Sequence, residues 1–361
     1  MKKIFLALLA VLCISSVCSA RSEKIIYCDA AQMGILGKID KVTPNPYHRV
    51  NTELYKGMTK DEARKVKCSA GLAIAFRTNA KSIWIRAQYG YKDYGCNTMG
   101  ISLRGYDLYV KQDTCWLWAG AACPKLKSEG DEFPLVENMD GSEKTFLLYL
   151  PIYSELEKLE IGVNETAHIK GAENPFHGRI GVFGSSFTQG IGTSRPGMSW
   201  PAQLGRSTGL GLLNLGVSGR CLMQDYFANV LCEAEVDAFI FDTFSNPGAD
   251  VIKKRLFDFI EKVQKAHPGI PLIFQQTIYR ERRNFNTEVE KYESEKMDMA
   301  EELMEKACKK FKNVYFVRPD ATSANHETST DGIHPNDYGY TLWADSVRQQ
   351  ILDILAQYDI K

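Results

Sequence analysis

The sequence predicts two domains of different fold class, an antiparallel β-sandwich followed by an α/β domain built on a parallel sheet. The 361 residues exceed what one hydrophobic core usually supports. Before about residue 172, short alternating apolar runs are bounded by turn residues, which is typical of sandwich strands. After about residue 176, apolar runs alternate with amphipathic segments, which is typical of a parallel sheet covered by helices.

The first twenty residues, MKKIFLALLAVLCISSVCSA, have the pattern of a secretory signal peptide: two lysines, a short apolar stretch and small residues before position 21. We therefore expect cleavage after Ala20 and an exported mature chain. The apolar stretch is short for a membrane span, and the rest of the sequence offers no other candidate. The interpretation divides the chain into a signal peptide (1–20), a sandwich domain (21–172) and an α/β domain (173–361).

The expected strands follow from the apolar runs of each half. In the sandwich they are GLAIAFRTN, KSIWIRAQY, DLYVKQ, KTFLLYLPIY and KLEIGV. In the α/β domain they are RIGVF, GLLNLGV, DAFIFDTF, PLIFQQTIY and NVYFVRP. The segment NETAHIKGAENPFHG, with Gly, Pro and polar residues, is expected to connect the domains. The segment TEVEKYESEKMDMAEELMEKACKKF is expected to form a surface helix.

Composition excludes several classes of partner. The formal net charge is zero and no basic stripe stands out, so neither nucleic acid nor an anionic membrane surface is implied. No CxxC or HExxH spacing occurs, and we expect neither a metal nor a cofactor. Export permits disulfides among the eight cysteines that follow the signal peptide, but the sequence does not pair them.

Chemically useful residues follow the expected strands of the α/β domain. Ligands of open parallel sheets bind beyond the carboxyl ends of the strands, where segments far apart in the chain meet. The stretch GVFGSSFTQG ends the first strand in a turn with two serines, which is either an ordinary helix cap or the position of a nucleophile. Across the four segments GSSF, VSGR, FSNP and DGIHPND, the candidate residues are Ser186, Gly219, Asn246, Asp331 and His334.

These residues are the parts that acyl transfer requires. Ser186 can attack a carbonyl carbon, His334 can take its proton, and Asp331 can orient the imidazole. The backbone N–H groups of Ser186 and Gly219, together with the Asn246 amide, can donate to the developing oxyanion. Their order after successive strands favours a hydrolase-type site with Ser186 as the nucleophile and Ser185 as its neighbour.

The same blocks resemble those of a known family. GSSFTQG, NLGVSGR, SNP and DGIHPND are similar to the four blocks of the SGNH (GDSL-type) hydrolases, and RGYDLYV at 104–110 resembles the GxDLY motif of the sandwich that precedes an exported subgroup. The resemblance implies a flavodoxin-like three-layer α/β/α domain, a jelly-roll-like sandwich and ester hydrolysis by the five residues above. Ser185 replaces the name-giving Asp, and SNP replaces GxND.

Three functions remain open at this point. The leading hypothesis is an exported serine esterase that removes a short acyl group, acetyl in the first place, from a carbohydrate. The alternatives are a lysophospholipase or thioesterase that uses the same site, and a glycan-binding module without activity. The expected partner is a small-molecule or oligosaccharide ester, and the sequence leaves the oligomeric state undetermined.

Two aromatic segments have expected roles. Arg195, Met198 and Trp200 follow the nucleophile closely and are expected to close the acyl side of the cleft, which would favour acetyl, with packing of Trp200 in the core as the alternative. Trp116 and Trp118 are expected to fill the sandwich core, with a sugar-stacking platform as the alternative.

Other polar residues are expected to be structural. Asp107 and Tyr109, within RGYDLYV, are expected to make hydrogen bonds at a strand end. The histidines without a partner motif are expected in loops or at the surface: His48, His168, His177, His267 and His326.

Overall fold

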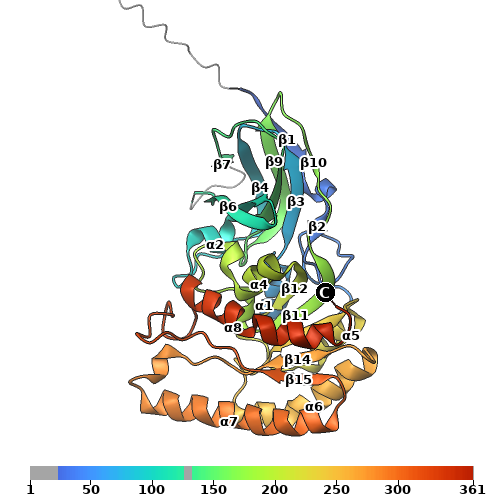
Figure 1. Cartoon of the computed structure of the whole chain (residues 1–361), viewed down its shortest axis with the longest axis vertical. Helices are drawn as coiled ribbons and strands as arrows, with labels where there is room; N and C mark the ends of the chain where they lie inside the picture. The colour runs from blue at the N-terminus through green and yellow to red at the C-terminus, as the bar shows by residue number, and fades with distance from the viewer. Residues whose placement is uncertain (1–22, 126–131, 361) are drawn as a thin grey trace, which may run out of the picture.

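Figure 1 shows a computed structural model of the chain, which describes residues 23–125 and 132–360. The predicted signal peptide lies outside the described residues. Antiparallel sheets form the upper part of the view, and a parallel sheet between helices forms the lower part. The predicted fold class, an α/β domain preceded by a β-sandwich, is therefore confirmed.

The sandwich consists of two antiparallel sheets that share one core. The first sheet has the order β1-β9-β4-β7, with β1 (Ile25–Asp29), β9 (Glu155–Asn164), β4 (Ile83–Tyr91) and β7 (Phe133–Val136). The second has the order β10-β3-β8-β5-β6, with β10 (Ile169–Gly171), β3 (Ala73–Thr78), β8 (Lys144–Tyr149), β5 (Tyr106–Gln112) and β6 (Cys115–Ala122), and β2 (Ile35–Leu36) pairs with β3. Side chains from both sheets, such as Ile85 and Phe146, are buried between them.

The parallel sheet has the strand order β12-β11-β13-β14-β15. Its strands are β11 (His177–Gly184), β12 (Leu210–Gly216), β13 (Ala238–Asp242), β14 (Leu272–Gln275) and β15 (Val314–Val317). In chain order this is 2-1-3-4-5, the doubly wound arrangement of flavodoxin-like folds. The first strand, β11, lies between β12 and β13, so its carboxyl end points into the switch point of the sheet.

Helices cover both faces of this sheet because successive strand residues point to opposite sides. One core contains side chains of α5 (Asp225–Glu233), α6 (Ala249–Ala266) and α7 (Thr287–Lys310). The opposite core contains side chains of α4 (Trp200–Thr208) and α8 (Asp337–Ala356). The long charged segment predicted as a surface helix is α7. The shorter elements are η1 (Ala30–Met33), α2 (Gly100–Arg104), α3 (Ser186–Gln189), η2 (Pro196–Met198) and η3 (Glu281–Arg283).

A segment of the N-terminal half leaves the sandwich and packs on the α/β domain. Residues 37–72, which include α1 (Lys60–Lys67), contribute Val50 and Val66 to the core beneath β12. The buried Arg49 donates from Nη1 to the carbonyl oxygens of Asn214 and Gly216, both at 3.0 Å. This stretch was predicted to belong to the sandwich domain, whereas in the structure it joins the two parts of the chain.

The RGYDLYV motif makes a second contact between the two parts. Asp107 is fully buried, and its Oδ2 accepts hydrogen bonds from Arg195 Nη1 at 2.8 Å and from the backbone N–H of Gly197 at 2.9 Å. Burial raises the pKa of Asp107, although Arg195 opposes the shift. Tyr109 also accepts from Arg195. The expected strand-end hydrogen bonds are therefore bonds to the other domain.

Two expectations about aromatic residues were wrong. Trp200 does not line a cleft but takes the alternative position in the core, where it is fully buried and stacks on Trp343 with ring centroids 5.6 Å apart. Trp118 does not fill the sandwich core, because it is 56% exposed on β6. His48 lies in a loop, as expected, but it is buried there with Nε2 2.8 Å from Glu155 Oε1.

The described cysteines are not paired in this structure. Each of the eight described cysteines, from Cys28 to Cys308, is a free thiol.

Candidate active site

The two serines lie where β11 turns into the short helix α3. Ser185 is the N-cap of α3, and its Oγ accepts from the backbone N–H of Phe187 at 3.1 Å. Ser186 is therefore the first helical residue, and only 5% of its surface is exposed. The turn requires glycine at position 184, because a Cβ there would lie 2.0 Å from Thr188 Oγ1.

A buried carboxylate that the sequence analysis did not identify holds this turn. Asp242, at the end of β13, is buried, and its Oδ2 accepts from the Ser185 Oγ at 2.7 Å and from the Ser185 N–H at 3.1 Å. The same oxygen accepts from Thr188 Oγ1 at 3.0 Å. Burial raises the pKa of Asp242, while these hydrogen bonds act in the opposite direction. Ser185 thus stabilises the turn through Asp242 and the helix cap, which leaves the hydroxyl of Ser186 for other contacts.

The histidine and aspartate candidates complete a chain of hydrogen bonds with Ser186. Ser186 Oγ lies 3.0 Å from His334 Nε2, and His334 Nδ1 lies 2.8 Å from Asp331 Oδ2. Both His334 and Asp331 belong to the loop before α8. This arrangement is the one in which an imidazole accepts a hydroxyl proton while a carboxylate orients the ring.

The Asp331 carboxylate is ionised over a wide pH range. Partial burial alone would raise its pKa, but hydrogen bonds from the His334 side chain, the His334 N–H and Asn97 hold the pKa well below its usual range. Asn97 belongs to the N-terminal half, and its Nδ2 donates to Asp331 Oδ2 at 2.9 Å. No motif in the sequence identified this contact.

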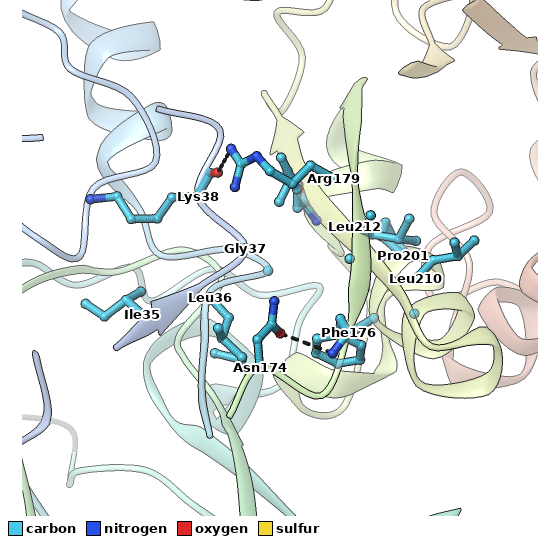
Figure 2. A pocket seen from close by; sticks show the side chains of 18 of the residues that line it. Ile35, Leu36, Gly37, Lys38, Asn174, Phe176, Arg179, Pro201, Leu210 and Leu212 are labelled. Atoms are coloured by element: carbon cyan, nitrogen blue, oxygen red, sulfur yellow. Dashed lines mark hydrogen bonds between the residues drawn. The ribbon is translucent and has the colours of Figure 1, made fainter. Parts of the chain in front are cut away.

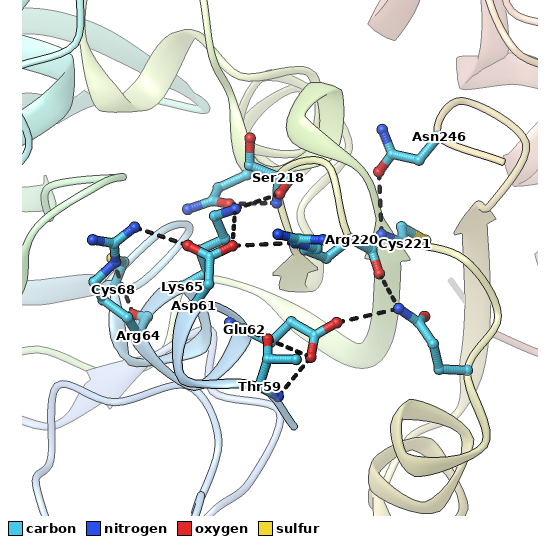
Figure 3. A network of polar contacts seen from close by, with 12 residues as sticks. Thr59, Asp61, Glu62, Arg64, Lys65, Cys68, Ser218, Arg220, Cys221 and Asn246 are labelled. Atoms are coloured by element: carbon cyan, nitrogen blue, oxygen red, sulfur yellow. Dashed lines mark hydrogen bonds and ion pairs between the residues drawn. The ribbon is translucent and has the colours of Figure 1, made fainter. Parts of the chain in front are cut away.

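The three expected oxyanion donors lie on three segments: the start of α3, the loop after β12 and the loop after β13. The N–H of Ser186 belongs to the first turn of α3, whose amides have no partner within the helix. Gly219 has φ +67°, and a Cβ there would meet no atom within 4 Å, so this backbone faces open space. Asn246 Oδ1 accepts from the Cys221 N–H at 3.1 Å, which directs the amide nitrogen away from that loop (Figure 3).

Helix α1 braces the loop that carries Gly219. Figure 3 shows Lys65 and Asp61 of α1 facing Ser218 and Arg220. Lys65 Nζ donates to the Ser218 carbonyl at 2.8 Å, and Arg220 Nε donates to Asp61 Oδ2 at 3.1 Å. From the other side, the Ser218 N–H donates to Gln189 Oε1 of α3 at 3.0 Å. The loop is thus bonded both to α3, which begins with Ser186, and to the N-terminal half.

A hollow between the two parts of the chain, shown in Figure 2, lies away from these residues. Its walls include Leu36, Phe176, Arg179 and Leu210, which lie near the amino ends of β11 and β12. Ser186 follows the carboxyl end of β11, at the opposite edge of the sheet. This hollow is therefore not part of the candidate active site.

The described residues contain neither a candidate metal-binding cluster nor a candidate membrane-spanning helix. Across residues 23–125 and 132–360, His, Cys, Asp and Glu side chains form no group of three or more that could hold a metal ion. None of the helices in the same part of the chain is both long and apolar enough to cross a membrane.

Comparisons with known proteins agree with the fold and the motifs. Residues 177–352 match the GDSL-like lipase/acylhydrolase family, and residues 25–169 match the GxDLY domain found at the N-terminus of SGNH hydrolase-type esterases. A GDSL-like lipase structure from Bacteroides ovatus is 38% identical, with a TM-score of 0.88, and the match covers 92% of this chain and 98% of that one. A search of curated proteins found no match.

More distant structures share the fold. A salicylyl-acyltransferase from a tetracycline biosynthetic pathway is 17% identical with a TM-score of 0.67, and the match covers 95% of this chain and 100% of that one. A family two carbohydrate esterase from Cellvibrio japonicus is 11% identical with a TM-score of 0.58, covering 92% and 99%.

The fold and the family matches define a carboxylic-ester hydrolase. More narrowly, the chain belongs to the GDSL-like lipase/acylhydrolase family, in the form that carries an N-terminal GxDLY domain.

Proposed function

We propose that the protein is an exported serine esterase that removes short acyl groups, above all acetyl, from carbohydrates. The observation that carries the proposal is the continuous hydrogen-bond chain from Ser186 Oγ through His334 to Asp331. In this proposal, residues 1–20 direct export, and residues 21–172 and 173–361 are the two domains of the mature enzyme.

The proposed reaction proceeds in two halves. Ser186 Oγ attacks the ester carbonyl carbon while His334 Nε2 takes the hydroxyl proton, and Asp331 stabilises the imidazolium. The oxyanion accepts hydrogen bonds from the N–H groups of Ser186 and Gly219 and from the Asn246 amide. Collapse of the tetrahedral intermediate breaks the bond to the alcohol, which leaves with the proton from His334. Water then hydrolyses the acyl-enzyme through the same steps and releases the carboxylic acid.

An open hollow that includes Ile333, the residue before His334, supports a carbohydrate as the alcohol part. Tyr292, Ile333 and Val289 line it together with Arg280. Ile333 precedes His334, and a Cβ on Gly248, two residues after Asn246, would lie 3.1 Å from the Tyr292 hydroxyl. The hollow thus contains the chain neighbour of His334, and its Tyr292 ring lies close to the segment that follows Asn246.

The hollow offers a sugar an aromatic ring to stack on. Tyr292 is 51% exposed and offers an aromatic face, while the exposed Arg282 and Glu288 at the rim offer charged hydrogen-bonding groups. A long acyl chain would instead need an enclosed apolar slot. The carbohydrate esterase with the same fold is consistent with this substrate class.

The test is a substrate panel with purified protein. We expect kcat/KM on p-nitrophenyl esters to be highest at C2 and to fall by C8, and we expect release of acetate from acetylated xylo-oligosaccharides. An enzyme for lipid esters would instead gain up to about 0.8 kcal/mol for each methylene it buries. A steady rise from C2 to C8 with no acetate released would replace the proposal by the lipid-ester alternative.

A variant at the hollow tests the sugar part separately. Tyr292→Ala should lower kcat/KM on the acetylated oligosaccharide about 10-fold and leave p-nitrophenyl acetate nearly unchanged, because only the sugar would stack on the ring. Tyr338→Ala is the matched control, since Tyr338 is also 51% exposed and does not line the hollow. Equal effects of the two variants on the oligosaccharide would contradict the assignment of the hollow.

A further inference from the structure

One residue of the N-terminal half touches the proposed catalytic carboxylate directly. Asn97 lies in the sandwich loop, defined here as residues 92–99 between β4 and α2. Its Nδ2 donates to Asp331 Oδ2 at 2.9 Å, across 234 positions of sequence. The same oxygen faces His334 Nδ1 at 2.8 Å, so Asn97 and the imidazole share one acceptor atom.

The other oxygen of the Asp331 carboxylate is bonded only within its own loop among the described residues. This oxygen, Oδ1, accepts from the backbone N–H groups of Ile333 at 3.0 Å and His334 at 2.8 Å. Those bonds come from its own loop and move with it. Asn97 donates its hydrogen bond from the N-terminal half, so this bond connects the Asp331 loop to the other part of the chain.

The sandwich loop is itself fixed to the α/β domain next to Asn97. Thr98 is buried, and its Oγ1 accepts from the Gly192 N–H at 2.8 Å. Gly192 in turn accepts at its carbonyl from Thr330 Oγ1 at 3.1 Å, within the loop that carries Asp331. Ser102 and Thr193 are joined through their hydroxyls at 2.5 Å. Thr98, which follows Asn97, and Thr330, which precedes Asp331, are therefore both bonded to Gly192.

We infer that Asn97 is a positioning residue for the esterase reaction, through which the N-terminal domain completes the active site. Asn97 holds Asp331 Oδ2 where it can accept from His334 Nδ1, and this keeps Nε2 directed at Ser186. A donor on the carboxylate also favours its ionised form, which is the form that stabilises the imidazolium. The inference rests on the proposed role of Asp331.

Two substitutions separate positioning from simple packing. Asn97→Ala should lower kcat about 10-fold with KM within about 2-fold of the parent, because the donor acts on the base and not on substrate binding. Asn97→Asp keeps the shape but turns the donor into a carboxylate that faces Asp331, and it should lower kcat further. Asn79→Ala is the matched control, because Asn79 only accepts from the His168 N–H at the far side of the sandwich.

A double-mutant cycle with Asp331→Ala identifies the route of the effect. If Asn97 acts through Asp331, Asn97→Ala should change kcat less than about 2-fold in the Asp331→Ala background. An equal loss in both backgrounds would overturn the inference. So would parent-like kcat in Asn97→Ala and Asn97→Asp while Asp331→Ala is impaired, and the proposed triad would then stand. Full activity of Asp331→Ala would overturn the triad itself and, with it, the role of Asn97.

Discussion

The nucleophile turn (residues 184–189) and the histidine loop (residues 328–336) reach the same site but are held in different ways. The nucleophile turn follows β11, which lies between β12 and β13 in the sheet. The carboxylate that holds it, Asp242, comes from the adjacent strand β13. The histidine loop contains one isolated bridge, between Ser329 and Pro335, and is bonded across the domain boundary by Asn97.

The difference teaches where each half of the chemistry originates. The position of the nucleophile is a property of the parallel sheet, because tight packing at Gly184 and buried hydrogen bonds allow one arrangement. His334, the proposed base, is linked through Asp331 to Asn97 of the N-terminal half. Substitutions of the residues that hold the two segments should therefore differ in what they change: stability for Asp242 and catalytic rate for Asn97.

The largest expected effect comes from removing the groups that the two segments bring together. Ser186→Ala and His334→Ala should each lower kcat by about 10⁴-fold or more, because nucleophile and base act as a unit. Ser185→Ala is the control, since it removes only a helix cap and a bond to Asp242. Steady-state kinetics on p-nitrophenyl acetate measures both. An inactive Ser185→Ala beside an active Ser186→Ala would reverse the assignment.

The next effect concerns Asn246, a proposed oxyanion donor that belongs to neither segment. Asn246→Asp keeps the acceptor for the Cys221 N–H but replaces the donor by a carboxylate, so kcat should fall by about 10²-fold to 10³-fold without loss of folding. Kinetics combined with a thermal unfolding curve checks this. Activity close to that of the parent would exclude Asn246 as a donor.

A stability measurement sharpens the comparison between the two segments. Asp242→Asn should lower the free energy of unfolding by about 1–3 kcal/mol, because its amide cannot accept all the bonds of the buried carboxylate. Asp298→Asn, an exposed residue of α7, is the matched control. Urea titrations of both should be compared with Asn97→Ala, which we expect to unfold like the parent. Equal destabilisation by Asp242→Asn and Asn97→Ala would remove the contrast.

The smallest effect is the shape of the pH profile. A protonated imidazole cannot take the Ser186 proton, so kcat/KM should fall as the pH is lowered. The pKa of Asp331 is held well below its usual range, so this carboxylate stays ionised on the acid side of the profile. The logarithm of kcat/KM should therefore rise with a slope of about one on the acid side. A slope of two would mean that a second group titrates together with the base.

The same shift has a consequence for stability. A carboxyl whose folded pKa lies below its unfolded value stabilises the fold above the unfolded pKa. That contribution from Asp331 should be lost only as the pH falls through the depressed folded pKa.

The sequence predicted the sheet and the motifs at its edge because both depend on local patterns. Each expected run overlaps an observed strand, although DAFIFDTF and PLIFQQTIY extend past the ends of β13 and β14, and polar residues after the strands meet at one edge. Helix α1 could also have been found, since Thr59 and Glu62 form a capping box. Its docking against the Gly219 loop could not, because no period or spacing records a contact between domains.

The contacts that the sequence did not predict are of that kind. Asn97 and Asp331 are 234 positions apart, and a lone asparagine in a loop has no signature. Asp242 ends a strand as many structural residues do, and only the fold brings it beneath Ser185. Trp200 was misjudged because its distance along the chain from Ser186 is short, whereas the first turn of α4 turns its ring into the core.

The most direct test of the central claim is the site of reaction with a fluorophosphonate, read by peptide mass spectrometry. Ser186, activated by His334, should carry a single adduct in the parent protein, and labelling should be far slower in His334→Ala. Ser186→Ala should carry none. An adduct on Ser185, or labelling that persists in Ser186→Ala, would contradict the account.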